Sequence, residues 1–307
     1  MACSGGCDSS ALALALAGSG ARVVLGHVLH DLRTGPDPET DRDAARVLSV
    51  RLGMPFLEAR VAVSASRGNR EGLARAARYR ALAGMARDAG CRYVATAHHG
   101  DDLIETMLMR LLRGAGPGGL GGVHPKRALR GGVTLVRPML RVGRDDAMEV
   151  CRAAGWTWRE DASNADTTRL RAAIRSRVAP ILKELGPTLV LRAGITCELL
   201  ADAAGLIGDR AEELGQRARA GPRCVEWSRS DLAAERAIVV GEVLRRAIAS
   251  VCEGRGADRG SARSLFRVAA LIRGEVHNRK TFAFAGAEIV VTGTRVLVRA
   301  PARSQAG

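Results

Sequence analysis

The stretch Ser4-Gly5-Gly6-Cys7-Asp8-Ser9-Ser10 leads directly into the apolar run Ala11–Ala17, and it decides the fold class that the sequence predicts. A glycine pair lets backbone amides approach a ligand, and the start of a helix over the apolar run adds unpaired N–H donors and a positive dipole. Serine hydroxyls add further donors, so the stretch predicts a phosphate-binding loop. Asp8 would repel a bare phosphate, and we interpret it as a ligand of a divalent cation that rides on the phosphate. A plain helix N-cap by Asp8 or Ser9 behind a glycine turn is the alternative.

Short apolar runs alternate with longer amphipathic ones from residue 22 to about residue 112. The runs Val23–Leu29, Phe56–Val63 and Arg92–Ala97 predict buried strands. Between them, Asp41–Leu52 and Glu71–Ala89 carry apolar residues at helical spacing, and glycine follows each. Strand–helix–strand repetition predicts an α/β fold with a doubly wound, mostly parallel sheet.

The middle of the chain changes character after residue 112. Gly114–Gly122 holds six glycines in nine residues and predicts a flexible basic loop. Residues 144–184 predict two helices separated by a polar turn, Asp161–Asp166.

The last third predicts a smaller helical domain that ends in a short antiparallel meander. Period-two alternation over Thr281–Arg299 predicts the meander. Helical patterns precede it at residues 193–220, 230–252 and 261–273. We therefore expect a catalytic domain over residues 1–187 and a second domain over residues 188–307.

The charge balance favours a polyanionic partner. The 307 residues carry 47 Lys+Arg against 32 Asp+Glu, a formal net charge of +15, and the excess is spread over both halves. Only Lys126, Lys183 and Lys280 are lysines, so this arginine bias can also reflect genome composition. This balance favours nucleic acid as the partner class.

Composition also excludes several protein classes. The longest wholly apolar stretch, Ala11–Ala17, is far shorter than the roughly 20 residues of a membrane-spanning helix. No Lys or Arg precedes that stretch, which disfavours a secretory signal. The seven cysteines are odd in number and contain no C-x-x-C pair, so neither a disulfide framework nor a zinc or iron–sulfur site is indicated. We expect a cytoplasmic protein without a membrane partner.

A second polar cluster follows the third predicted strand. It reads Thr96-Ala97-His98-His99-Gly100-Asp101-Asp102, with Glu105 one helical turn further on. Ligands of α/β sheets bind beyond the carboxyl ends of the strands, so one of these carboxylates could join Asp8 on Mg²⁺. The imidazoles could contact phosphate or accept a proton. Simple capping of the next helix by Asp101 and Asp102, or a dinuclear metal phosphoesterase, are the alternatives.

These motifs resemble a known family. S-G-G-x-D-S at a strand-to-helix turn is similar to the pyrophosphate loop of the N-type ATP pyrophosphatases, the PP-loop superfamily, and lacks the G-K-[ST] of a Walker A loop. With five further segments in order, residues 3–182 resemble tRNA(Ile)-lysidine synthetase. Those segments are His27–Arg33, Asn69–Tyr79, Arg113–Gly122, Arg137–Leu140 and Trp158–Asp166.

The resemblance implies an adenine nucleotide alpha hydrolase-like fold and a ligase that forms a carbon–nitrogen bond. Such enzymes use ATP to adenylate the wobble cytidine of tRNA(Ile) with a CAU anticodon, and free L-lysine then displaces AMP. ATP and Mg²⁺ are the implied cofactors, and tRNA and lysine the implied partners. The oligomeric state is left open, with a homodimer as one arrangement.

The resemblance also implies roles for individual residues. The ATP-binding set is Ser4, Gly5, Gly6, Cys7, Asp8 and Ser9, with Cys7 interpreted as a small buried side chain and not a nucleophile. The catalytic set is Asp8, His99, Asp102, Glu105 and Arg171, of which Asp8 and Glu105 are the implied metal ligands. The set expected to contact tRNA or nucleotide is Arg75, Arg78, Arg113 and Arg175.

Two departures from the family pattern keep other functions in view. Ala172 stands where the pattern has Asn. Only Met1-Ala2-Cys3 precede the loop, where a central strand of about five or six residues should feed it. We therefore expect that the native start lies upstream or that the chain is truncated.

The alternatives are a PP-loop tRNA thiolase, which the lack of C-x-x-C disfavours, and a catalytically decayed ATP- and tRNA-binding protein. Synthetases that make GMP or NAD share the loop but need other downstream motifs.

Overall fold

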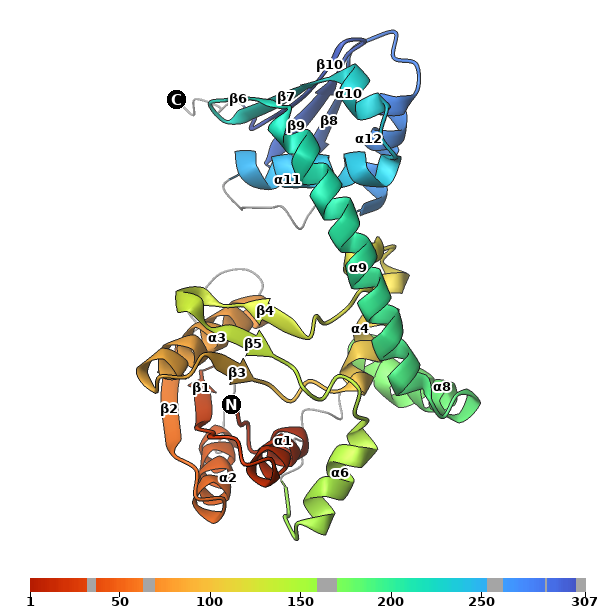
Figure 1. The fold of residues 1–307 in the computed structure, drawn as a ribbon. Coiled ribbons are helices and arrows are strands. Elements are labelled where there is room, and N and C mark those ends of the chain that lie inside the picture. Colours follow the sequence, from red (N-terminus) through yellow and green to blue (C-terminus); the bar gives the residue numbers. More distant parts are fainter. Residues whose placement is uncertain (32–36, 63–69, 159–169, 253–261, 285, 302–307) are drawn as a thin grey trace. The chain divides into compact units, whose positions relative to one another are not determined.

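The computed structural model describes residues 1–31, 37–62, 70–158, 170–252, 262–284 and 286–301 (Figure 1). The chain forms two compact units. The first comprises Met1–Met109 and Gly122–Cys197, and the second comprises Arg110–Gly121 and Glu198–Gly307. The division falls inside helix α9 (Leu189–Gln216), whereas the sequence places the domain boundary just before that helix.

The first unit contains a mostly parallel sheet. Strand β1 (Leu25–His30) pairs in parallel with β2 (Phe56–Val61). Strand β3 (Tyr93–Ala95) pairs in parallel with β5 (Thr134–Val136), and β4 (Lys126–Ala128) adds to β5 in the antiparallel sense. This arrangement confirms the α/β class and the predicted parallel pairing.

Residues 1–3 lie between the two strand pairs, at the central position that the sequence predicts for the strand feeding the loop. The amide of Ala2 donates to the carbonyl of Ala95 at 2.8 Å. The amide of Cys3 donates to Gly26 O at 2.9 Å, and the Gly26 amide donates to Met1 O at 2.7 Å. The strand order across the unit is therefore β2, β1, residues 1–3, β3, β5 and β4.

Helices pack on both faces of this sheet, as a doubly wound fold requires. Leu82 of α3 (Arg70–Asp88) shares a hydrophobic cluster with Val28 of β1. Leu25 of β1 shares a different cluster with Ala13 of α1 (Cys7–Gly18) and Leu48 of α2 (Asp37–Arg51). Because side chains alternate along a strand, positions 25 and 28 point to opposite faces.

The remaining helical segments of the first unit follow β3 and β5. They are α4 (Gly100–Leu112), which continues into the second unit, the 3-10 turn Arg130–Gly132, α6 (Arg144–Ala153), α7 (Leu170–Ala173), the π-helical segment Ile174–Val178 and α8 (Ala179–Leu185). The two helices predicted over 144–184 are thus α6 and a composite helix from 170 to 185. The predicted turn Asp161–Asp166 lies outside the described residues.

The second unit has its own antiparallel sheet, with five strands in the order β6-β7-β10-β9-β8. Their bounds are β6 (Arg219–Gly221), β7 (Cys224–Ser228), β8 (Lys280–Phe284), β9 (Ala287–Val291) and β10 (Arg295–Arg299). The last three strands confirm the predicted meander. The first two were missed, and the helical pattern predicted through residue 220 was wrong at its end, because α9 stops at Gln216.

One hydrophobic core holds the second unit together. Val240 and Leu244 of α11 (Ala237–Val251) and Ile272 of α12 (Ala262–Arg273) pack with Val296 of β10. Trp227 of β7 joins this core, and its indole N–H donates to the carbonyl of Leu214 at 2.9 Å.

Two short helices complete the second unit, α5 (Pro117–Leu120) and α10 (Arg229–Ala233). Helix α5 lies inside the glycine-rich stretch that the sequence predicts as a loop. Within the part of the chain that the structure describes, no helix combines the length and apolar character needed to cross a lipid bilayer.

Candidate active site

The glycine-rich loop is held in shape by Ser9. The Ser9 hydroxyl accepts a hydrogen bond from the Ser4 amide at 3.1 Å and donates one to the Gly6 carbonyl at 3.0 Å. Gly5 has φ +84°, and a Cβ at this position would lie 2.5 Å from the backbone oxygen of Asp41. The loop therefore needs glycine at position 5, and Ser9 acts first as an internal clamp.

Helix α1 begins at Cys7, directly after this loop, with extended backbone at Gly6 and no side-chain cap at its N-terminus. Its first amides are donors of the kind that bind phosphate. Burial, together with the neighbouring Cys151, raises the pKa of the Cys7 thiol to about 12. Cys7 is thus a neutral, buried side chain, and it offers a ligand its backbone amide and no thiolate.

Two carboxylates of α4 are bound by arginines from the segment after residue 170. Glu105 has a side chain that is only 1% exposed. It accepts hydrogen bonds from Arg171 Nε at 2.7 Å and from Arg175 Nε and Nη2 at 2.5 and 3.1 Å. Asp102 accepts one from Arg171 Nη2 at 2.6 Å. These pairs join α4 to residues 171–175.

His99 lies at the centre of three carboxylates. Its Nε2 is 3.6 Å from an oxygen of Asp8 and 3.6 Å from an oxygen of Asp102, and its Nδ1 is 3.6 Å from an oxygen of Asp101. Burial acts to lower the pKa of His99, but the contact with Asp8 and the charges of Asp102 and Asp101 outweigh it, so the pKa is raised. His99 therefore links the phosphate loop to α4, and the carboxylates around it favour its protonated form.

Asp101 connects α4 to two other helices. It accepts a hydrogen bond from the backbone amide of Arg144 at 2.8 Å, and Lys183 Nζ lies 2.5 Å from its other oxygen. Burial acts to raise the pKa of Asp101, but Lys183 and the Arg144 amide outweigh it and the pKa is lowered. Asp101 is therefore an anion that holds α6 and α8 against α4.

His98 and His27, two further histidines of the motifs, are neutral. Burial lowers the pKa of His98 to about 4, and its Nδ1 lies 2.9 Å from the Thr96 hydroxyl. Burial also lowers the pKa of His27, whose Nδ1 donates to the carbonyl of Cys3 at 2.8 Å. His27 thus supports the strand before the loop.

The arginines expected to contact RNA or nucleotide fall in different places. Arg75 and Arg78 lie on α3, and the guanidinium of Arg75 lies 5.4 Å from the ring centroid of Tyr79. Arg113 is exposed just after α4. Arg175, by contrast, donates a hydrogen bond to Glu105 and so belongs to the cluster of carboxylates on α4.

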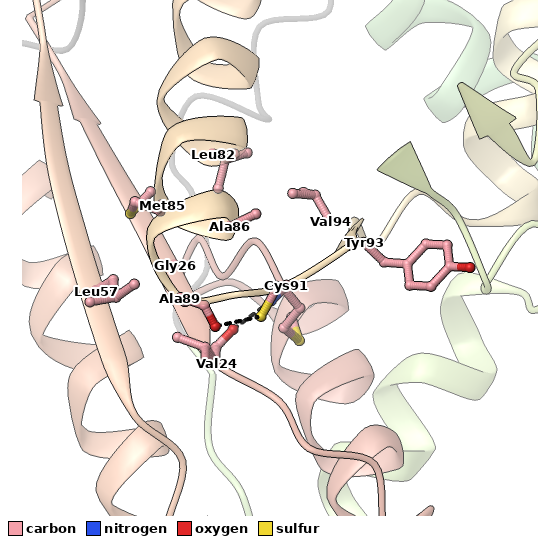
Figure 2. A pocket seen from close by; sticks show the side chains of 11 residues that line it. Val24, Gly26, Leu57, Leu82, Met85, Ala86, Ala89, Cys91, Tyr93 and Val94 are labelled. Atoms are coloured by element: carbon pink, nitrogen blue, oxygen red, sulfur yellow. Dashed lines mark hydrogen bonds between the residues drawn. The ribbon is translucent and has the colours of Figure 1, made fainter. Parts of the chain in front are cut away.

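A separate hollow lies at the amino-terminal ends of the strands (Figure 2). Apolar side chains line most of it, among them Leu57, Leu82 and Met85. Val24 and Cys91, which precede β1 and β3, also line it. Because α/β sheets bind ligands beyond the opposite, carboxyl ends of their strands, this hollow is not the candidate active site.

Comparison with known proteins identifies the family. The model of the PP-loop domain family matches residues 1–182. The chain is 38% identical over 262 residues to the tRNA(Ile)-lysidine synthase of Methylobacterium nodulans, a match that covers 83% of this chain and 75% of that protein. The chain belongs to the tRNA(Ile)-lysidine synthase family. The resemblance predicted from the sequence motifs is confirmed.

For other members of the family, the match covers a smaller share of their own length. The tRNA(Ile)-lysidine synthase of Bordetella bronchiseptica is 38% identical over 69% of this chain, and the match covers 63% of that protein. The enzyme of Thermus thermophilus is 37% identical over 69% of this chain, but only 41% of its own length is covered. The chain thus spans from about two fifths to three quarters of these family members.

A solved structure supports the fold. The U34-tRNA thiolase NcsA from Methanococcus maripaludis with its [4Fe-4S] cluster has a TM-score of 0.53 to this structure. It is 16% identical in sequence, and the likeness covers 66% of this chain and 70% of that chain. At this identity the likeness concerns the fold alone.

The structure brings most of the family-derived residues together. Asp8, His99, Asp102, Glu105 and Arg171 form one continuous chain of contacts. Sequence reasoning missed Lys183, because its partner Asp101 is far away in the sequence and no local pattern links them. The family segment that ends at Asp166 lies, from residue 159 on, outside the described residues.

Proposed function

We propose that this chain ligates free L-lysine to the wobble cytidine of tRNA(Ile) with a CAU anticodon. The observation that carries the proposal is the contact, through His99, between Asp8 of the phosphate loop and Asp102 of α4, in a chain of this family. Family membership supplies the reaction, and this contact unites the nucleotide-binding motif with the second polar motif. We assign catalysis to residues 1–187 and tRNA contact to residues 188–307.

In the first step the wobble cytidine is activated. Its ring carbonyl oxygen bonds to the α-phosphorus of ATP while the bond from that phosphorus to pyrophosphate breaks. The amides at the start of α1 and of Gly5 and Gly6 would bind the departing phosphates. Negative charge grows on pyrophosphate as it leaves, so donors fixed before the reaction stabilise the transition state.

Mg²⁺ is part of the proposal, and Asp8 fits it. Asp8 Oδ1 is buried and, among the described residues, has no hydrogen-bond partner, so a carboxylate oxygen is available for a hard cation. When bound, the ion would neutralise phosphate charge. Both oxygens of Glu105 already accept hydrogen bonds from arginine, so Glu105 would have to release Arg171 or Arg175 to serve as a ligand.

In the second step the ε-amine of lysine bonds to the activated ring carbon, and AMP leaves. The amine must be unprotonated to attack, and it loses a further proton as the new bond forms. The groups that we consider for this proton transfer are His98, whose pKa of about 4 leaves it neutral, and the carboxylates Asp8 and Asp102. The carboxylates around His99 raise its pKa and favour its protonated form, in which it would stabilise negative charge and would not accept this proton.

The test is AMP and pyrophosphate release by the full chain with ATP, Mg²⁺, lysine and a tRNA(Ile) transcript bearing CAU. We expect AMP release only when lysine and this tRNA are both present, no more than about one pyrophosphate per chain when lysine is omitted, and neither product from Asp8→Ala. The control is Asp43→Ala, which removes an exposed carboxylate of α2. Release without lysine dependence would indicate another modification. Absence of release from a folded chain that binds tRNA would favour the decayed binding protein.

A further inference from the structure

Three arginines from three separate elements surround one tyrosine of the first unit. The guanidinium of Arg75, on α3, lies 5.4 Å from the ring centroid of Tyr79, and that of Arg127, on β4, lies 4.8 Å from it. Arg137 follows β5, and its guanidinium acts electrostatically on the Tyr79 hydroxyl. We call Arg75, Tyr79, Arg127 and Arg137 the arginine–tyrosine cluster.

Among the described residues, these three arginines make no ion pair with a carboxylate. Arg137 is only 6% exposed, and its Nη1 donates to the carbonyl of His124. Its Nε and the Tyr79 hydroxyl are both buried, and neither has a hydrogen-bond partner in the described part of the chain. A buried cation normally has an anionic partner, because losing its hydration is costly.

The pKa of Arg137 is lowered, as expected for a buried cation without an anionic partner. Burial acts first to lower its pKa, the Tyr79 hydroxyl opposes this, and the positive charges of Arg127 and Arg75 lower it further. Clustered like charges that are partly desolvated repel one another. An anion placed among them would remove that repulsion and satisfy the unpaired donors.

The cluster lies at the same edge of the sheet as the phosphate loop, but not on it. Arg137 and Arg75 both act on His98, which follows β3 at the carboxyl edge. Strands are spaced about 4.8 Å apart, so β5 and β4 lie about 10 and 14 Å from residues 1–3, which feed the loop. The loop and the part of the cluster on and after β4 and β5 therefore occupy separate positions along this edge, with β3 between them.

We propose that Arg75, Arg127 and Arg137, together with the Tyr79 hydroxyl, form a phosphate site that holds a backbone phosphodiester of the RNA next to the modified nucleotide. The inference rests on the proposed function and deepens it. Guanidinium groups match phosphate geometry with paired N–H donors. The phosphates of ATP are expected at α1, and lysine brings none, which leaves the RNA backbone as the anion for the second position.

The first experiment measures binding of the CAU tRNA transcript to Arg75→Gln and Arg127→Gln over about 50 to 200 mM salt. We expect each variant to bind about tenfold more weakly, as for loss of one hydrogen-bonded charge, with a salt slope reduced by about one. The matched control is Arg92→Gln. Arg92 is exposed, as Arg127 is, and it also lies over a tyrosine, 5.9 Å from the ring centroid of Tyr93, but at the amino-terminal edge of the sheet.

The second experiment replaces single phosphates around the wobble position by neutral methylphosphonates in an anticodon stem–loop. One of these RNAs should bind the wild-type chain about tenfold more weakly. The same RNA should lose little or nothing further with Arg127→Gln, because the charge pair is then already broken. Additive losses at every position would show a diffuse field and overturn the site.

A third measurement, with a non-hydrolysable ATP analogue, separates the two phosphate sources. Its affinity should be unchanged in both variants. Weaker analogue binding with unchanged tRNA binding would assign the cluster to the nucleotide and overturn the RNA site. Arginine-dependent RNA binding without lysine-dependent turnover would retain the site and reject the proposed function. Lysine-dependent turnover together with wild-type-like RNA binding by both variants would support the proposed function and reject the phosphate site.

Discussion

The ion-paired Glu105 is the group whose loss should cost the first unit most. We consider Glu105→Gln, which preserves the shape of the side chain and removes its charge. Three arginine hydrogen bonds at 2.5 to 3.1 Å converge on this carboxylate, whose side chain is 1% exposed. Glutamine keeps one acceptor oxygen but turns an NH₂ group toward one of the two arginines. The change therefore breaks at least one hydrogen bond and leaves two cations beside a neutral group.

The magnitude follows from charge and exposure. Two unit charges about 4 Å apart attract by about 4 kcal/mol at an effective dielectric constant of about 20. Removing one partner of a buried pair costs about 3–5 kcal/mol. Arg171 and Arg175 are 42% and 34% exposed, so water recovers part of their solvation once they are released. We therefore expect a loss near the lower limit, about 3 kcal/mol, or a decrease in Tm of about 6–12 °C.

Urea unfolding followed by circular dichroism, together with a thermal scan, would measure this loss. The matched control is Glu58→Gln, because Glu58 pairs with Arg46 at 3.0 Å on the surface, and it should cost less than about 1 kcal/mol. Combining Glu105→Gln with Arg175→Gln should cost less than the sum of the single losses, by at least about 1 kcal/mol. A Glu105→Gln loss no larger than that of Glu58→Gln, or strict additivity, would refute the reasoning.

Three further predictions concern the loop and its neighbours. Gly5→Ala should cost about 1–3 kcal/mol of stability and weaken binding of an ATP analogue, because position 5 has φ +84° and the new methyl group would meet Asp41 O; unchanged calorimetric affinity would contradict this. His99 has a raised pKa, so its charge stabilises the fold fully below about pH 6.5, and this contribution is lost as pH rises through the folded-state value. The stability difference between wild type and His99→Gln should therefore shrink from pH 6 to 9, and a widening difference would show the opposite sign. Cys7, with a pKa of about 12, should resist iodoacetamide at pH 8 in the folded chain and react in urea; rapid labelling of Cys7 without urea would show that its thiol is exposed.

Local sequence motifs were enough to predict much of the fold and part of the candidate active site. The Ser4–Ser10 loop and the His98–Glu105 cluster could be placed at one edge, because the carboxyl ends of parallel strands meet there. The meander at the end of the chain was readable because its alternation is strict. Strands β6 and β7 were not, because they are short and follow an alanine-rich helical pattern that runs up to residue 220.

Ion pairs between side chains far apart in the chain could not be predicted from the sequence. Nothing local assigns Arg171 and Arg175 to Glu105, since about 65 to 70 residues separate the partners and only the folded chain brings them together. The same holds for Lys183 and Asp101. The hydroxyl of Ser9 shows a different limit, because the motif predicts contact with phosphate whereas the structure also gives it an internal clamping role.

Two groups of arginines thus lie near the carboxyl ends of the parallel strands in the first unit, and they differ in whether carboxylates neutralise them. Arg171 and Arg175 are paired with the carboxylates of α4, whereas the arginine–tyrosine cluster has no carboxylate partner among the described residues. Salt screens exposed charges over about 10 Å but affects buried pairs much less. Raising salt should therefore weaken RNA binding steeply while the cost of Glu105→Gln barely changes. The two salt responses have different origins. If RNA binding depends on salt and the cost of Glu105→Gln does not, one group of arginines at this edge stabilises the fold and the other binds the substrate.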